Sequence, residues 1–202
     1  GTPAILESVR AGLVFQLKEA VGYDQIKHRE HDFIRRAISA WGENLNIHIL
    51  GNKDAWRLSI VSFMIRHNGG FLHHNFVVAV LNDLLGIQAR GGCSCAGPYG
   101  HRLLGIDLTK SKEFEREVLR GCEGVKPGWV RVNFNYFISE TAFDFIIRAV
   151  DLVATEGWKL LPHYRFEADT GQWVHRKGRS HRVKRLHDLS YRSGRLEYRS
   201  RE

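Results

Sequence analysis

The chain has 202 residues, of which 43% are hydrophobic, and it carries a formal net charge of +8 at pH 7. This length suits one medium domain with appendages, and no apolar run reaches the ~20 residues that a membrane span requires. The three cysteines include a Cys-x-Cys pair rather than a secreted disulfide framework, so we expect a reducing, cytoplasmic setting.

Two helices are predicted in the first part of the chain. Apolar residues recur at helical spacing over residues 5–21, and Gly22 follows as a stop. A second amphipathic helix is expected over residues 24–41, with Asp24 as its N-cap. Because no signal or transit sequence opens the chain and its only methionine is Met64, we expect a fragment of a longer protein.

The middle of the chain predicts strands alternating with helices at irregular intervals. Strands are expected over residues 46–50, 58–65, 87–89 and 129–136, and helices over residues 75–86, 111–120 and 139–156. Asn75, Ser111 and Ser139 are the predicted N-caps of these helices. The irregular spacing favours an α/β (α+β) domain in which a mixed sheet packs with helices.

The last part of the chain differs in composition. Residues 164–166 and 173–175 predict a hairpin. Residues 175–202 contain ten Lys/Arg against three Asp/Glu, whereas the remainder is nearly neutral. Such a basic tail favours a solvated arm over nucleic-acid binding. We therefore expect an extension over residues 161–202, after a central domain over 43–160.

One loop carries the residues with the most evident chemistry. Arg90 is followed by two glycines and by two thiols, Cys93 and Cys95. Glycines allow a loop to move, a thiolate is a nucleophile, and a guanidinium binds carboxylates. This combination indicates thiol chemistry on an anionic substrate.

This loop also resembles a known family. Residues 74–96 end in Arg90-Gly-Gly-Cys-Ser-Cys95-Ala96 and resemble the cysteine desulfurase branch of the class V, fold-type I, pyridoxal-phosphate enzymes, which carry Arg-x-Gly-x-x-Cys-Ala. The blocks Gly1-Thr2-Pro3 and Val130-Arg131-Val132 look like two further segments of that family. The resemblance covers roughly residues 1–160. It implies a small C-terminal domain preceded by helices from the large cofactor-binding domain, residues 1–42.

The resemblance implies roles for individual residues. Cys95 would attack the substrate sulfur, leaving alanine and an enzyme persulfide. Arg131 would bind the substrate carboxylate through two parallel hydrogen bonds, and Arg90 would orient cofactor or substrate. Thr2 and the backbone of Gly1 would contact the phosphate of pyridoxal 5'-phosphate.

The resemblance also implies partners. The substrate would be a small amino acid, a protein or cofactor would accept the sulfur, and the full-length enzyme would be a homodimer. No lysine of this chain fits the position that binds the cofactor covalently. We therefore expect the full-length parent to hold the cofactor and the isolated fragment to be inactive.

Several alternatives remain open. The Cys-x-Cys loop particularly resembles the desulfurase-like domain of molybdenum cofactor sulfurases, and a selenocysteine lyase or an epimerase would use similar residues. Cys93 could relay the persulfide or be a passive neighbour. A zinc site could draw on Cys93, Cys95, His101 and Cys122, although Cys-x-Cys matches the usual Cys-x2-Cys spacing poorly, so no metal is expected. Finally, the basic tail could make the chain a non-catalytic binding module.

Overall fold

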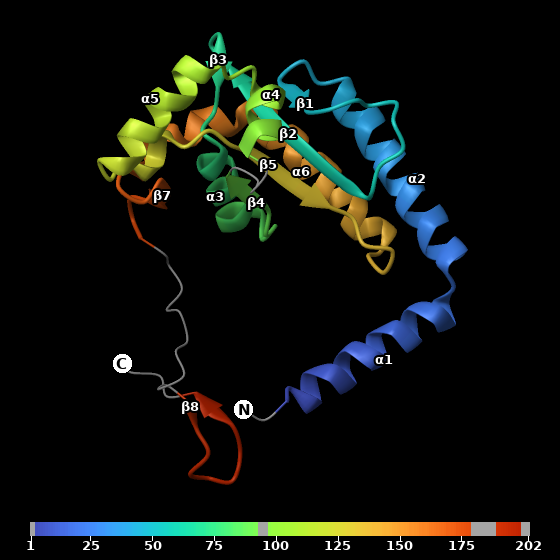
Figure 1. Cartoon of the computed structure of the whole chain (residues 1–202). Helices are drawn as coiled ribbons and strands as arrows, with labels where there is room; N and C mark the ends of the chain where they lie inside the picture. Colours follow the sequence, from blue (N-terminus) through green and yellow to red (C-terminus); the bar gives the residue numbers. More distant parts are fainter. Residues whose placement is uncertain (1–2, 93–96, 179–188, 199–202) are drawn as a thin grey trace.

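The computed structural model describes residues 3–92, 97–178 and 189–198 (Figure 1). Its helices are α1 (Ile5–Val21), α2 (Tyr23–Gly42), α3 (His74–Leu85), α4 (Gly97–Leu104), α5 (Leu108–Leu119) and α6 (Glu140–Glu156), with 3-10 turns η1 (Glu123–Val125) and η2 (Gly157–His163). Its strands are β1 (Ile47–Ile49), β2 (Ile60–His67), β3 (Gly70–Phe71), β4 (Arg90–Gly92), β5 (Trp129–Asn133), β6 (Tyr164–Glu167), β7 (Gln172–His175), β8 (Leu189–Ser190) and β9 (Glu197–Tyr198).

The main sheet has the strand order β1-β2-β5-β4, and β3 pairs with β2. Every pairing among the described strands is antiparallel, which corrects the mixed sheet that we expected. The error has a physical origin, because runs of β-branched residues do not reveal strand direction. The α/β (α+β) class itself is confirmed, since helices pack against this sheet.

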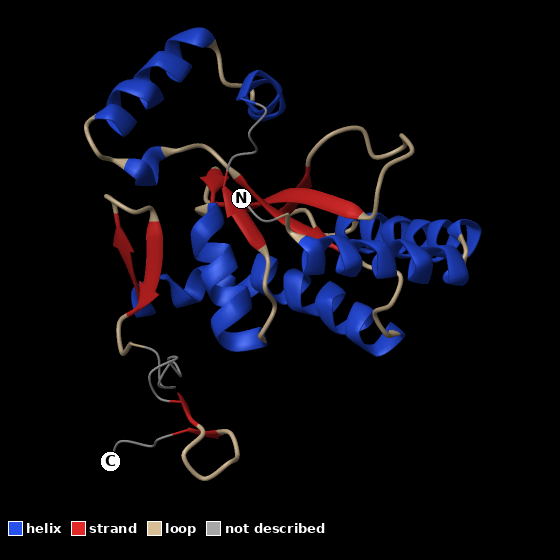
Figure 2. Ribbon diagram, turned by 60° about the horizontal axis from the view of Figure 1, so that its bottom comes forward, coloured by secondary structure: helices blue, strands red, loops and turns tan. Residues whose placement is uncertain are grey.

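Alternation along the strands makes the sheet one-sided. Val61 and Phe63 of β2 and Val130 and Val132 of β5 belong to the buried core. The residues between them face the opposite side, because successive side chains in a strand alternate between the two faces. The helices α2, α3 and α6 cover the core face, whereas α4 lies on the other side (Figure 2).

Helix α2 shares this core. Trp41 is completely buried, with its ring centroid 5.4 Å from that of Phe63 and 5.9 Å from that of Phe134. Its indole Nε1 donates a hydrogen bond to the carbonyl of Ile147 in α6. The division of the chain at residue 42 stays a prediction, and this packing favours a boundary before α2.

Helix α1 contrasts with α2. It has the predicted bounds, but none of its residues is buried, and large apolar side chains such as Leu13 and Phe15 are more than half exposed. None of the described helices is long and apolar enough to cross a membrane.

Most predicted elements occur within a few residues of their expected positions, including the β6–β7 hairpin. Ser139 caps α6 as predicted, since its Oγ accepts from the Ala142 N–H at 3.1 Å. The strand predicted over residues 87–89 is wrong, because pairing with β5 begins only at Arg90. The short helix α4 was not expected.

Three helix caps differ from the prediction. Asp24 lies inside α2, whose N-cap position is held by Gly22 without a side-chain hydrogen bond. The caps of α3 and α5 also change. The side chain of His73, rather than Asn75, accepts the backbone N–H at the start of α3. Asp107, rather than Ser111, caps α5 through the Lys110 N–H at 2.8 Å. In both cases an acceptor lies a few residues earlier, and the helix starts there instead.

Candidate functional site

The structure brings Arg90 and Arg131 together on adjacent strands. They are direct cross-strand partners in the β4–β5 register. Because Val130 and Val132 face the core, Arg131 faces the opposite side of the sheet. Arg90 shares this side, since directly opposed residues lie on one face with Cβ atoms about 5 Å apart. Two predicted site residues, 41 positions apart in sequence, are therefore neighbours.

A third polar residue extends this row. Ser62 of β2 is the cross-strand partner of Arg131 on its other side. It is half-buried and lies between the core residues Val61 and Phe63, so it faces the same side as the two arginines. Ser62 is not among the site residues predicted from the sequence. The alternation of apolar residues around it was the available signal, but the neighbouring strand could not be identified from sequence. We call the row of Ser62, Arg131 and Arg90 the arginine face.

The arginine face has uncompensated positive charge. Among the described residues, neither Arg90 nor Arg131 makes an ion pair or a side-chain hydrogen bond. Like charges directly opposite each other on a sheet repel. An anion bound between the guanidinium groups would remove this repulsion and would fill their donors.

Arg36 shows the opposite arrangement in the same molecule. Its guanidinium contacts Asp32 at 3.1 Å, Glu140 at 2.9 Å and Asp144 at 3.4 Å. The hydrogen bond to Glu140, followed by that to Asp32, raises the pKa of Arg36 above its usual value. Arg36 thus has carboxylate partners, whereas Arg90 and Arg131 have none among the described residues.

The predicted nucleophile Cys95 lies outside the described residues, as do Cys93, Gly1 and Thr2. Both ends of the loop that carries Cys95 are nevertheless described. Gly92 packs so closely on Gly128 that a Cβ at Gly128 would lie 2.6 Å from the Gly92 carbonyl carbon.

The other end of the loop enters α4. A Cβ at Gly100 would lie 3.3 Å from Cη2 of Trp129, a buried side chain on the same side of the sheet as Arg131. Gly128 and Trp129 are consecutive, so both ends of the cysteine loop are fixed at the start of β5, within three residues of Arg131. The described residues on either side of this segment, Gly92 and Gly100, therefore lie beside the start of β5.

His74 lies beneath the root of this loop. It is buried, its ring stacks on that of His73 with centroids 4.4 Å apart, and a Cβ at Gly128 would lie 2.8 Å from its Cε1. Burial, followed by the proximity of His73, lowers the pKa of His74 to about 4. The imidazole is therefore neutral at pH 7, and it packs against the glycines without adding charge.

The zinc alternative receives no support from the described part of the chain, which holds no group of three or more His, Cys, Asp or Glu residues suited to a metal. Cys122 is a free, half-buried thiol there. Two of the four suggested ligands, Cys93 and Cys95, lie outside the described residues.

A family model for class V aminotransferases matches residues 1–120, which include Arg90 but neither Arg131 nor the hairpin. The structure resembles the apo structure of a cysteine desulfurase from Thermococcus onnurineus NA1, with a TM-score of 0.57 and 24% sequence identity over 77% of this chain. The matched part is 32% of the desulfurase chain, so this chain spans about a third of that protein. No curated protein matches the chain.

Proposed function

Because this chain belongs to the class V aminotransferase family, we propose that it forms the small-domain portion of a pyridoxal-phosphate-dependent cysteine desulfurase. Enzymes of this family typically use that cofactor. The observation that carries the proposal is the arginine face, where two guanidinium groups without a partner among the described residues lie beside Gly92, which precedes the cysteines. A carboxylate-bearing amino acid is the matching substrate class.

The arginine face does not include a residue that could anchor the cofactor. Such enzymes bind it covalently through a lysine, yet β2, β4 and β5, which carry the arginine face, contain no lysine. The arginine face therefore provides no covalent anchor for the cofactor. It fits the recognition of an anionic group.

In this proposal Arg131 binds the carboxylate of L-cysteine through two parallel N–H···O bonds, which a lysine could not reproduce. Arg90 adds a second positive charge, and the Ser62 hydroxyl can donate to the same anion. The Cys95 thiolate forms a sulfur–sulfur bond with the substrate while the substrate carbon–sulfur bond breaks. The carbon can keep the electron pair only with an electron sink, which the cofactor would supply in the complete enzyme, and it takes up a proton, so alanine leaves and a persulfide remains on Cys95.

The decisive experiment uses the complete polypeptide that carries this chain, with pyridoxal phosphate and L-cysteine, and measures alanine and sulfide. We expect wild type to form both products and Cys95→Ser to form neither. Arg131→Lys should mainly raise KM, by about 10- to 100-fold, because it loses the bidentate contact. Cofactor binding without any sulfide release would overturn the desulfurase assignment while leaving the fold intact.

The alternatives are separated by the same assay. Release of selenide from selenocysteine, without sulfide from cysteine, would indicate a selenocysteine lyase, and racemisation would indicate an epimerase. Transfer of sulfur only in the presence of molybdenum cofactor would indicate a sulfurase. Homodimerisation, a protein sulfur acceptor and a cytoplasmic location stay predictions.

A further inference from the structure

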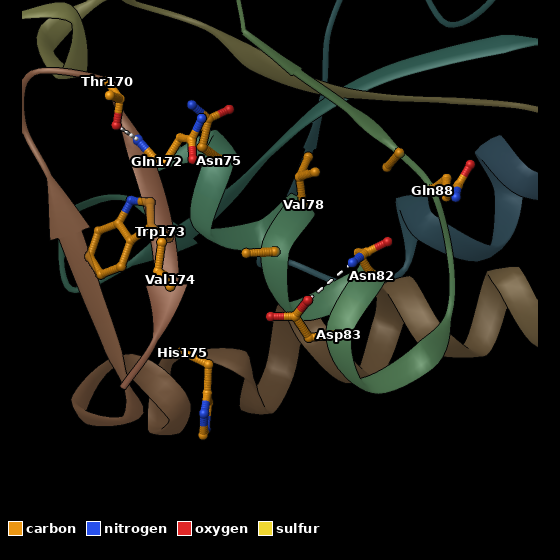
Figure 3. A pocket seen from close by; sticks show the side chains of 12 residues that line it. Asn75, Val78, Asn82, Asp83, Gln88, Thr170, Gln172, Trp173, Val174 and His175 are labelled. Atoms are coloured by element: carbon orange, nitrogen blue, oxygen red, sulfur yellow. Dashed lines mark hydrogen bonds between the residues drawn. The ribbon is translucent and has the colours of Figure 1, made fainter. Parts of the chain in front are cut away.

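A polar groove lies apart from the arginine face, on the helix-covered side of the sheet. It has a volume of about 790 Å³ and runs between α3, the segment before β4, and β7. Figure 3 shows Val78 and Asn82 on α3, between β7 on one side and Gln88 on the other. The β7 wall lies beyond residue 120, outside the part of the chain that matches the family.

One wall of this groove is a free strand edge. The Arg176 N–H donates to the His163 carbonyl at 2.8 Å, so residues 163 and 176 form a hydrogen-bonded pair in the β6–β7 register. Such pairs alternate along an antiparallel ladder. The backbone groups of Trp173 and His175 therefore point away from β6, toward the free edge.

These edge groups lack partners. Among the described residues, no hydrogen bond involves the N–H or the carbonyl of Trp173 or the N–H of His175, whereas the His175 carbonyl accepts from Gly178. An unpaired strand edge is a template for a further strand. Both residues line the groove.

The side chains of the groove suit a polypeptide backbone. Asn82, Gln88 and Gln172 each carry an amide that can both donate and accept, which matches the alternating groups of an extended chain. The small side chains of Val78 and Ala79 leave space above α3. Pockets that bind small molecules are mostly apolar. The lining of this groove is not mostly apolar, so an apolar small molecule fits it less well.

The charge of the groove determines which peptides would bind there. Asp83 is the one acidic or basic residue of the lining other than His175, and no described Lys or Arg forms an ion pair with it. Its Oδ1 accepts from Asn82 at 3.0 Å and its Oδ2 from the Tyr164 hydroxyl at 3.2 Å. Both contacts fix the carboxylate but leave its negative charge uncompensated.

We propose that this groove binds an extended segment of a partner polypeptide, which adds as a strand to the free edge of β7 and places a Lys or Arg side chain against Asp83. The proposed occupant is a separate chain, and among the described residues the last segment, β8 with β9, pairs only with itself. The proposal does not depend on the proposed enzymatic activity, because it rests on the groove and the strand edge alone.

The test is an amide NMR titration of the whole 202-residue chain with an acetylated eight-residue peptide of alternating Thr and Val with a central Lys. We expect the amide signals of Trp173 and His175 to shift and to become protected from hydrogen exchange. The same peptide with a central Glu should bind at least about 10-fold more weakly. A peptide N-methylated on the bonding edge should not bind.

Two pairs of variants test the contribution of strand pairing to peptide binding separately from the contribution of charge. Asp83→Asn should abolish the preference for Lys over Glu, whereas Asp54→Asn, outside the groove, should preserve it. His175→Pro removes one free N–H and should weaken binding, whereas His175→Ala should retain it.

Three results would overturn the proposal. The first is no shift of Trp173 or His175 with the Lys peptide up to about 1 mM. The second is equal binding of the N-methylated peptide. The third is exchange protection of both amides in the free protein, which would mean that this chain already occupies its own edge.

Discussion

At the scale of single residues, the arginine face is the main feature that distinguishes this surface from the rest of the molecule. Arg90 and Arg131 are opposed across β4 and β5 without a carboxylate partner among the described residues, whereas Arg36 has three. The two guanidinium groups repel each other when no anion is bound. An anion bound between them removes this repulsion, so such an arrangement favours anion binding.

Replacing Arg90 with Gln should therefore stabilise the ligand-free chain. We expect the free energy of unfolding at low ionic strength to rise by about 0.5 kcal/mol, since opposed like charges destabilise a sheet by a fraction of a kcal/mol. Urea denaturation measures this change. Arg36→Gln is the matched control and should lower the stability. Sulfate should stabilise wild type more than Arg90→Gln, and a loss of stability in Arg90→Gln would contradict this account.

Gly91 illustrates a glycine that packing requires. A Cβ there would lie 2.6 Å from Oδ1 of Asn75 and 3.0 Å from Cγ2 of Val78. Gly91→Ala should therefore destabilise the chain by about 2 kcal/mol, as overpacking commonly does, with a lower midpoint of thermal unfolding. Gly97→Ala, where nothing lies within 4 Å, should change the midpoint little. Equal effects of both substitutions would refute the close contact between β4 and α3.

His74 predicts a pH dependence of stability. Burial lowers its pKa to about 4 in the folded state, so below its unfolded pKa of about 6.5 the unfolded chain binds a proton that the folded chain does not. Stability should thus be complete above pH ~6.5 and fall as the pH drops toward 4, by up to about 3 kcal/mol from this residue.

The variant His74→Phe tests this assignment. It should flatten the acid part of the stability profile, measured by urea denaturation between pH 7 and 4. His101→Phe, which removes a half-buried histidine on α4, is the control variant. A profile that stays equally steep in His74→Phe would assign the acid sensitivity to other groups.

At the scale of elements, helical spacing located five of the six described helices to within a few residues and missed α4, whereas the caps of α2, α3 and α5 required the structure. Several Ser, Asn and Asp residues stand near each predicted start, and each is an acceptable cap by type. The backbone decides which side chain can reach an unpaired N–H. The short strand β4 illustrates the same limit, because its residues form a strand only through their pairing with β5.

The caps of α5 and α6 give a matched test of this point. Ser139→Ala and Asp107→Ala should each lower the stability by about 1 kcal/mol, since each removes an acceptor from a helix N-terminus. Ser111→Ala should leave it unchanged or slightly raise it, because Ser111 lies inside α5 and alanine favours helices. Thermal denaturation followed by circular dichroism measures all three. A clear loss in Ser111→Ala would favour the sequence-based cap.

At the scale of the whole molecule, α1 extends from the packed domain with apolar side chains exposed (Figure 1). Exposed apolar side chains gathered on one helix are typical of an interaction site or an aggregation liability. The isolated chain should therefore self-associate. Light scattering should show a concentration-dependent mass, and the double variant Leu13→Glu, Phe15→Glu should reduce it. The matched variant Glu7→Gln, Glu19→Gln should not, and a chain that stays monomeric at high concentration would contradict this expectation.

The sequence alone determined five of the six described helices, the class of fold and the family, because helical periodicity and the Arg90–Cys95 loop are local patterns that need no knowledge of distant contacts. Only the tertiary structure decided that the sheet is antiparallel, that Ser62 joins the two arginines, and that β7 borders a groove with α3. Each of these facts depends on which strand lies beside which, and strand pairing joins residues far apart in sequence through backbone groups that every residue shares.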